Sequence, residues 1–134
     1  MKIGIAFVAS VAVALVVAAC SPVGPSSQFK EVFSGTVEQR GDFRKTFSVG
    51  CSGASTSCEY QINLTSMTPD PSVQVQLSLA TADCRQTINA ALVVAGQAGL
   101  AGTNMTSGTY CVAVIDVGYL TRSESIIGNF THPQ

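Results

Sequence analysis

Two stretches of strict alternation between apolar and polar residues constrain the fold of this chain more than any other feature. Over residues 58–65 the apolar positions are Cys58, Tyr60, Ile62 and Leu64, and over residues 73–79 they are Val73, Val75, Leu77 and Leu79. A period of two is typical of a strand with one buried and one solvated face. Such sheets are antiparallel. The two stretches therefore predict antiparallel strands, joined by a turn at Thr68-Pro69-Asp70-Pro71.

Weaker alternation predicts further strands on either side, over residues 33–37, 43–49, 109–117 and 125–132. In the third of these, Tyr110, Val112 and Val114 share one face, and both faces are expected to be covered; in the last, Ile126 and Phe130 are expected to point inward. Residues 88–94 fit either a strand or a short helix, and we interpret them as a strand. About seven to nine short strands with regularly spaced turns predict an all-β, antiparallel β-sandwich.

The amino-terminal segment has the pattern of a signal peptide. Met1 and Lys2 precede an uncharged, apolar run over residues 3–19. The run is also about as long as a short membrane-spanning helix, so a simple membrane anchor is the alternative. Since no basic stop-transfer cluster follows and small residues precede Cys20, we expect a helical signal peptide over residues 1–19.

Val17-Ala18-Ala19-Cys20 resembles the bacterial lipobox, in which an aliphatic residue, a variable residue and a small residue precede a cysteine. The resemblance implies cleavage before Cys20 and attachment of palmitate-type acyl chains, and several chains are needed for durable anchoring. Ser21, in place of Asp, implies the outer membrane under the Gram-negative sorting rule. We expect the lipidated cysteine and a flexible Ser/Pro-rich linker over residues 20–32, and a folded domain over residues 33–134.

With Cys20 assigned to lipid, four of the five cysteines remain, namely Cys51, Cys58, Cys84 and Cys111. Small exported domains use disulfides to supplement a limited core. Of the three possible pairings we favour Cys51 with Cys58, which closes a short loop, and Cys84 with Cys111, which joins two strands. A zinc site is the competing interpretation, but no C-x-x-C pair is present and the single histidine, His132, lies far along the chain. We predict no metal and no cofactor.

Three segments resemble the pre-peptidase C-terminal type of domain: residues 107–118 (SGTYCVAVIDVG), Ser34-Gly35-Thr36-Val37 and Asn129-Phe130-Thr131-His132-Pro133. Domains of this type are small jelly-roll β-sandwiches of secreted bacterial proteins, often beside a peptidase. The resemblance implies a jelly roll from about residue 33 onward, with Cys111 on an outer face, and an accessory role in targeting or binding. Some relatives bind calcium through acidic clusters, but Asp70, Asp83 and Asp116 are well separated, so this site is not expected.

Composition and motifs disfavour nucleic-acid binding and catalysis. The 7 basic and 8 acidic residues nearly balance, so the basic surface that nucleic acids require is missing. A Ser–His–Asp arrangement can be drawn with His132 and Asp116, but no nucleophile elbow supports it. We therefore expect a surface histidine and no enzyme.

The expected function is that of a non-catalytic envelope lipoprotein whose sandwich binds a protein or glycan at the cell surface. Because rigid sandwiches present function on loops, we expect the contact region in residues 50–57, 81–86 and 118–125, gathered at one end. A purely structural envelope lipoprotein is the alternative, and an inhibitor or enzyme acting on envelope polymers is a further one.

Overall fold

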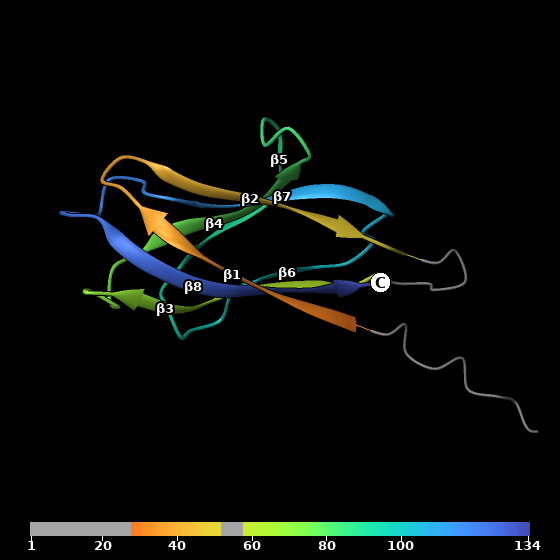
Figure 1. The fold of residues 1–134 in the computed structure, drawn as a ribbon, viewed down its shortest axis with the longest axis horizontal. Helices are drawn as coiled ribbons and strands as arrows, with labels where there is room; N and C mark the ends of the chain where they lie inside the picture. The colour runs from red at the N-terminus through yellow and green to blue at the C-terminus, as the bar shows by residue number, and fades with distance from the viewer. Residues whose placement is uncertain (1–27, 52–57) are drawn as a thin grey trace, which may run out of the picture.

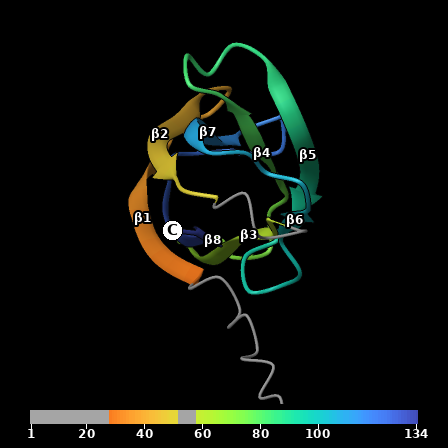
Figure 2. The same ribbon diagram turned by 90° about the vertical axis from the view of Figure 1, so that its right-hand side faces the viewer.

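Two antiparallel four-stranded sheets face each other in the computed structural model, which describes residues 28–51 and 58–134 (Figures 1 and 2). The strands are β1 (Gln28–Val37), β2 (Asp42–Val49), β3 (Tyr60–Thr68), β4 (Val75–Thr81), β5 (Thr87–Val93), β6 (Leu100–Gly102), β7 (Gly108–Ile115) and β8 (Glu124–Pro133). Sheet A has the order β1-β8-β3-β6, and sheet B has the order β2-β7-β4-β5. The all-β antiparallel sandwich predicted from the alternation is confirmed.

The strand pairing identifies the sandwich as a jelly roll. β1 pairs with β8, β2 with β7, β3 with β6 and β4 with β5. This is the pattern of one long hairpin that turns between β4 and β5 and is rolled up. Successive strands lie in different sheets, except for β4 and β5, which are neighbours in sheet B. The further pairs β3–β8 and β4–β7 complete each sheet. Eight strands in this order form a jelly roll, which is the fold that the family resemblance implied.

The core lies between the sheets and is filled by the alternate residues that the sequence pattern selects. Ile62 and Leu64 of β3 and Leu77 and Leu79 of β4 are all at most 1% exposed. The ring of Phe130 packs edge-on against Phe47 of the other sheet, with centroids 5.2 Å apart. Burial of such side chains contributes about 1.5–3 kcal/mol each, so this apolar layer is the main source of stability.

β3 and β4 start and end two or three residues later than predicted, and larger departures occur at β1, which includes residues 28–32 of the expected linker, and at β6, which was not predicted. β1 begins at Gln28 rather than at residue 33, because residues 28–32 pair through their backbone with the end of β8. Phe29 and Val32 are 42% and 60% exposed, so this part of the strand carries no alternation of burial that a sequence could reveal. β6 has only three residues, ends in a glycine and is recognisable only through its pairing with β3. Residues 88–94, by contrast, form the predicted strand β5 almost to the residue.

The connections alternate between the two ends of the sandwich. The β2–β3, β4–β5 and β6–β7 connections lie at the end where β1 starts and β8 finishes, which we call the terminal end. There the backbone N–H of Gly50 donates to the carbonyl of Pro133 (3.3 Å). The β1–β2, β3–β4, β5–β6 and β7–β8 connections lie at the opposite end, where the backbone N–H of Asp70 donates to the carboxylate of Glu124 (3.0 Å).

This alternation corrects the expected contact region. Residues 50–51 and 81–86 lie at the terminal end, whereas residues 118–125 lie at the opposite end, because an odd and an even connection of this topology cannot share an end. The three loops therefore do not form one surface.

Several expectations fall outside the described residues, namely the signal peptide, Cys20, the linker up to residue 27 and loop residues 52–57. Within the described part of the chain, no helix has the length and apolarity needed to cross a bilayer.

Candidate functional site

A groove runs along the outer face of sheet A beside β3. It consists of two open hollows, of about 450 Å³ and 500 Å³, that share Gln61. The hollow nearer the terminal end includes Gln28, Glu59 and Thr103 in its lining. The other hollow is lined mainly by polar residues, among them Lys30, Asn63, Thr65, Gln97, Asn129 and Thr131. We call the two together the outer groove.

Strand alternation and register place these side chains on one surface. Because Ile62 and Leu64 point into the core, Gln61 and Asn63 of β3 point outward. Across the sheet, Gln61 lies opposite Thr131 of β8, and Thr131 lies opposite Lys30 of β1. Side chains at directly opposed positions have Cβ atoms about 4.5–5.5 Å apart. Three strands therefore contribute to one continuous row of polar groups.

The floor of the groove is formed by Asn129. This residue of β8 is 5% exposed although it points away from the core. Its Oδ1 accepts a hydrogen bond from Asn63 Nδ2 (3.5 Å), and Asn63 Oδ1 accepts one from Gln61 Nε2 (3.4 Å). Among the described residues, the Nδ2 of Asn129 has no hydrogen-bond partner, and no side-chain nitrogen or oxygen is both unpartnered and shut off from solvent. The Nδ2 of Asn129 therefore opens onto the groove.

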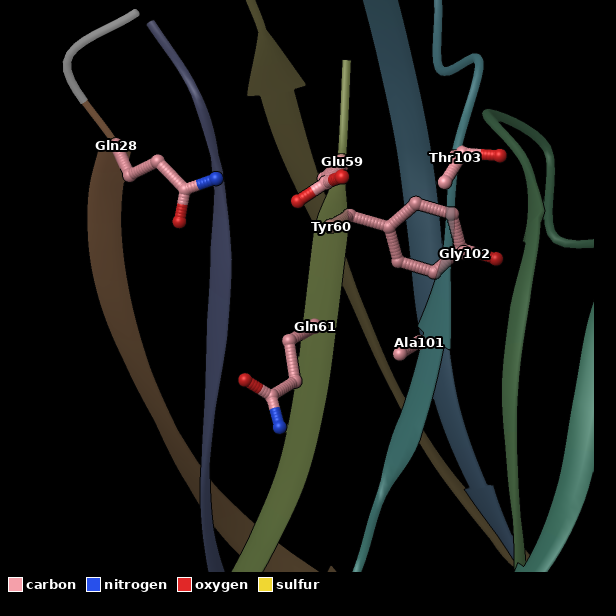
Figure 3. A pocket seen from close by; sticks show the side chains of 7 residues that line it. All are labelled: Gln28, Glu59, Tyr60, Gln61, Ala101, Gly102 and Thr103. Carbon is pink, nitrogen blue, oxygen red and sulfur yellow. The ribbon is translucent and has the colours of Figure 1, made fainter. Parts of the chain in front are cut away.

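At the terminal end, the close packing of Tyr60 against Gly102 forms one side of the outer groove. The ring of Tyr60 extends from β3 toward Gly102 of β6, while Gln28 and Gln61 stand on the other side, flanking β8 (Figure 3). A Cβ at position 102 would lie 2.6 Å from the Tyr60 ring, so only glycine fits there. Asn89 of β5 donates from Nδ2 to the Tyr60 hydroxyl (2.9 Å) and to the Ala101 carbonyl (3.2 Å). These bonds tie sheet B to the edge of sheet A beside the groove.

The charge of the outer groove is close to neutral. Its lining contains one cation, Lys30, and one anion, Glu59, while the other polar lining groups are amides and hydroxyls. Amides and hydroxyls both donate and accept hydrogen bonds. The arrangement can therefore bind a polar, uncharged ligand over an extended surface.

The four cysteines form the favoured pairs. Cys51 is bonded to Cys58 and Cys84 to Cys111, with Cα atoms 6.1 Å and 5.3 Å apart. The second bond forms because Cys111 lies opposite Ala80, close to the turn that carries Cys84. None of the four is among the groove-lining residues.

His132 is buried, which corrects the expectation of a surface histidine. It is 1% exposed, with Nδ1 2.7 Å from the carbonyl oxygen of Pro133 and Nε2 2.9 Å from Oε2 of Glu31. Its ring packs beside Phe130, with centroids 4.7 Å apart. Both ring nitrogens are thus occupied within the protein.

Asp116 lies at the opposite end of the sandwich from His132. Its carboxylate accepts hydrogen bonds from the backbone N–H groups of Arg40, Gly118, Tyr119 and Leu120, at 2.7–3.1 Å. Burial tends to raise the pKa of the Asp116 carboxyl, but these four donors outweigh it and lower the pKa below its ordinary value. Asp116 organises the β7–β8 connection, and the structure does not bring it together with His132.

Metal ligands do not gather in the described residues, where no group of three or more His, Cys, Asp or Glu side chains could hold an ion. The chain matches no protein-family profile and no curated protein sequence.

The outer groove was not found from the sequence. The alternation shows that Gln61 and Asn63 face solvent, but it does not show that β8 lies beside β3. The one available signal was the concentration of Asn, Gln and Thr at outward positions of these two strands.

Proposed function

We propose that this protein is a non-catalytic, lipid-anchored module of the cell envelope that binds a protein or glycan in the outer groove. The observation that carries the proposal is Asn129, a buried amide on the outer face of a sheet whose Nδ2 opens onto the groove. The hydrogen bond from Asn63 to its Oδ1 fixes the orientation of this amide. Its Nδ2 is therefore a positioned donor that a ligand oxygen can reach from the groove.

The environment of His132 supports a non-catalytic role. A general base needs a ring nitrogen that can reach the substrate. In this chain the single histidine is buried, and its two nitrogens face Pro133 and Glu31. Its ring nitrogens therefore contact other protein groups and do not face the solvent, where a substrate would bind.

The position of the first strand fits an anchor at Cys20. Residues 21–27 separate this cysteine from Gln28, the first residue of β1. A flexible linker of this length spans about 15 Å on average. With lipid on Cys20, the terminal end of the sandwich would face the membrane, and the groove would run outward from it.

The absence of Asp at position 21 supports the outer membrane as the location. The accessory role implied by the resemblance to pre-peptidase C-terminal domains suits such a tethered module.

The proposal is tested by retention of the mature lipoprotein, solubilised in detergent, on isolated cell-wall sacculi and on outer-membrane proteins. We expect saturable retention that is weakened by Gln61→Ala or Thr131→Ala in the groove. Thr46→Ala, an exposed outward position of β2 on sheet B, is the matched control and should retain normal binding. Wild-type protein that binds neither fraction, or binding that the groove variants leave intact, would overturn the proposal and favour a purely structural lipoprotein.

A further inference from the structure

We infer that the ligand of the outer groove is a neutral glycan strand that lies along β3. This inference rests on the proposed function and specifies its ligand class. Three features of the groove carry it: the chemistry of the lining, its extent along the strand and the open amide of Asn129.

The lining matches sugar hydroxyl groups. A hydroxyl of a sugar donates one hydrogen bond and accepts others, and it is best met by side chains that can do both. The side-chain amides of Gln61 and Asn63 and the hydroxyl of Thr131 have this capacity. Lys30 and Glu59 offset each other in charge, so the groove offers no excess of cations for a polyanionic strand.

The same lining is a poor match for a protein partner. Protein interfaces depend on a central cluster of apolar and aromatic anchors, and extended peptides bind by adding a strand to a sheet edge. The outer groove lies on a sheet face, and its central stretch is formed by Gln61, Asn63 and Thr131. Its aromatic member, Tyr60, is 6% exposed and packs against Gly102.

The extent of the groove suits a chain rather than a single sugar. It follows β3 from Glu59 to Thr65. At about 3.3 Å per residue this is a path of about 20 Å, which is several sugar rings long. Both hollows are open, so a strand can enter and leave without a free end.

Asn129 supplies a directional contact at the centre of this path. Its Oδ1 is occupied by Asn63, which leaves Nδ2 to donate to a ring or hydroxyl oxygen of the ligand. Because the hydrogen bond from Asn63 holds the amide in one orientation, the Nδ2 is positioned to exchange its contact with groove water for a hydrogen bond to a ligand oxygen.

The test measures binding of the detergent-solubilised mature lipoprotein to defined probes by titration calorimetry. The probes are N-acetylglucosamine oligomers and dextran oligomers as neutral glycans, heparin oligomers as anionic glycans, and a disordered casein peptide. We expect a neutral oligomer to bind, with affinity that rises with length and changes little with salt. Asn129→Asp, which keeps the shape of the side chain but removes its N–H donors, should weaken binding about tenfold. Gln61→Ala, at an exposed position, should also weaken it, whereas Thr46→Ala should not.

The outcomes separate the inference from the proposed function. If Asn129→Asp does not fold, as judged by its thermal transition, Gln61→Ala and Thr131→Ala decide the question alone. Peptide binding that Gln61→Ala weakens would overturn the glycan assignment and leave the groove as a binding site. Salt-sensitive binding of heparin alone would likewise overturn it. If no probe binds in a way that the groove variants affect, and the lipoprotein is not retained on sacculi or on outer-membrane proteins either, both conclusions are wrong.

Discussion

The Nε2 atom of His132 lies 2.9 Å from a carboxylate oxygen of Glu31, inside the terminal end of the sandwich. The carbonyl oxygen of Pro133 faces the other ring nitrogen at 2.7 Å, and because a carbonyl only accepts, Nδ1 carries a hydrogen. The two side chains therefore act as a unit that joins β1 to β8.

This pairing predicts a coupled loss of stability. Glu31→Ala should lower the free energy of unfolding by about 1–3 kcal/mol, because it leaves a buried ring nitrogen without a partner. In a His132→Phe background the same change should cost less, with a coupling energy of about 0.5–3 kcal/mol in a double-mutant cycle. Urea denaturation of the four proteins measures both, with exposed Thr36→Ala on β1 as the control. Additive effects would contradict the pairing.

The two disulfides are expected to contribute unequally. Their cysteines are separated by 7 and 27 residues, and the loop-closure model gives about 2–3 kcal/mol for the shorter loop and about 3–4 kcal/mol for the longer one. Cys58 and Cys111 are similarly buried, so truncation itself costs about the same in both cases. Cys84→Ala/Cys111→Ala should therefore unfold at lower denaturant concentration than Cys51→Ala/Cys58→Ala. Non-reducing peptide mapping that joins Cys51 to Cys111 would refute the pairing.

A glycine in β8 is required by close packing. A Cβ at Gly128 would lie 2.6 Å from the backbone carbonyl oxygen of Asn63 and would overlap the ring of Phe33. The carbonyl belongs to β3 and cannot move without disturbing the pairing. Gly128→Ala should therefore destabilise the protein by about 1–3 kcal/mol, measured as a shift of the thermal midpoint. Ser125→Ala, an exposed position of the same strand, should change stability by no more than about 0.5 kcal/mol.

Patterns along the sequence predicted those strands in which buried and exposed residues alternate and the backbone is regularly paired. β3 and β4 alternate apolar and polar residues along most of their length, so their existence and inward faces followed from the sequence. The Cys84–Cys111 pair, favoured because it would join two strands, is confirmed: Cys111 of β7 lies opposite Ala80 of β4, the strand that precedes Cys84. The start of β1 and the whole of β6 are held by pairing with distant strands, and local alternation carries no record of such contacts.

The candidate site depends on adjacency at long range. Asn63 and Asn129 are 66 residues apart in the chain and meet because β8 inserts between β1 and β3. The burial of His132 has the same origin, since its partner Glu31 is 101 residues away. A pattern read along the chain can assign each residue to a face, but it cannot assign neighbours on that face.

The lowered pKa of Asp116 predicts that the folded protein loses stability in acid. Its pKa is lowered in the folded protein, so its contribution is fully present above the unfolded pKa of about 4 and is lost as the pH falls toward the folded value. Asp116→Asn places an amide group opposite backbone donors and should cost about 1–3 kcal/mol at pH 7. The difference from wild type should shrink below about pH 4. Denaturation curves from pH 3 to 7 measure this, with Thr121→Ala, exposed in the same connection, expected to follow wild type throughout.

The anchor can be tested separately from the ligand. If Cys20 is lipidated, Cys20→Ala removes the thiol that accepts the diacylglyceryl group, and the exported product should be uncleaved or soluble. Metabolic labelling with radioactive palmitate should mark the wild-type protein and not the variant, whereas Cys84→Ala/Cys111→Ala should still be labelled. Label in Cys20→Ala would refute the lipobox interpretation. Because the groove residues belong to the folded domain, the variant should keep its affinity for any ligand of the groove, which distinguishes loss of the anchor from loss of the site.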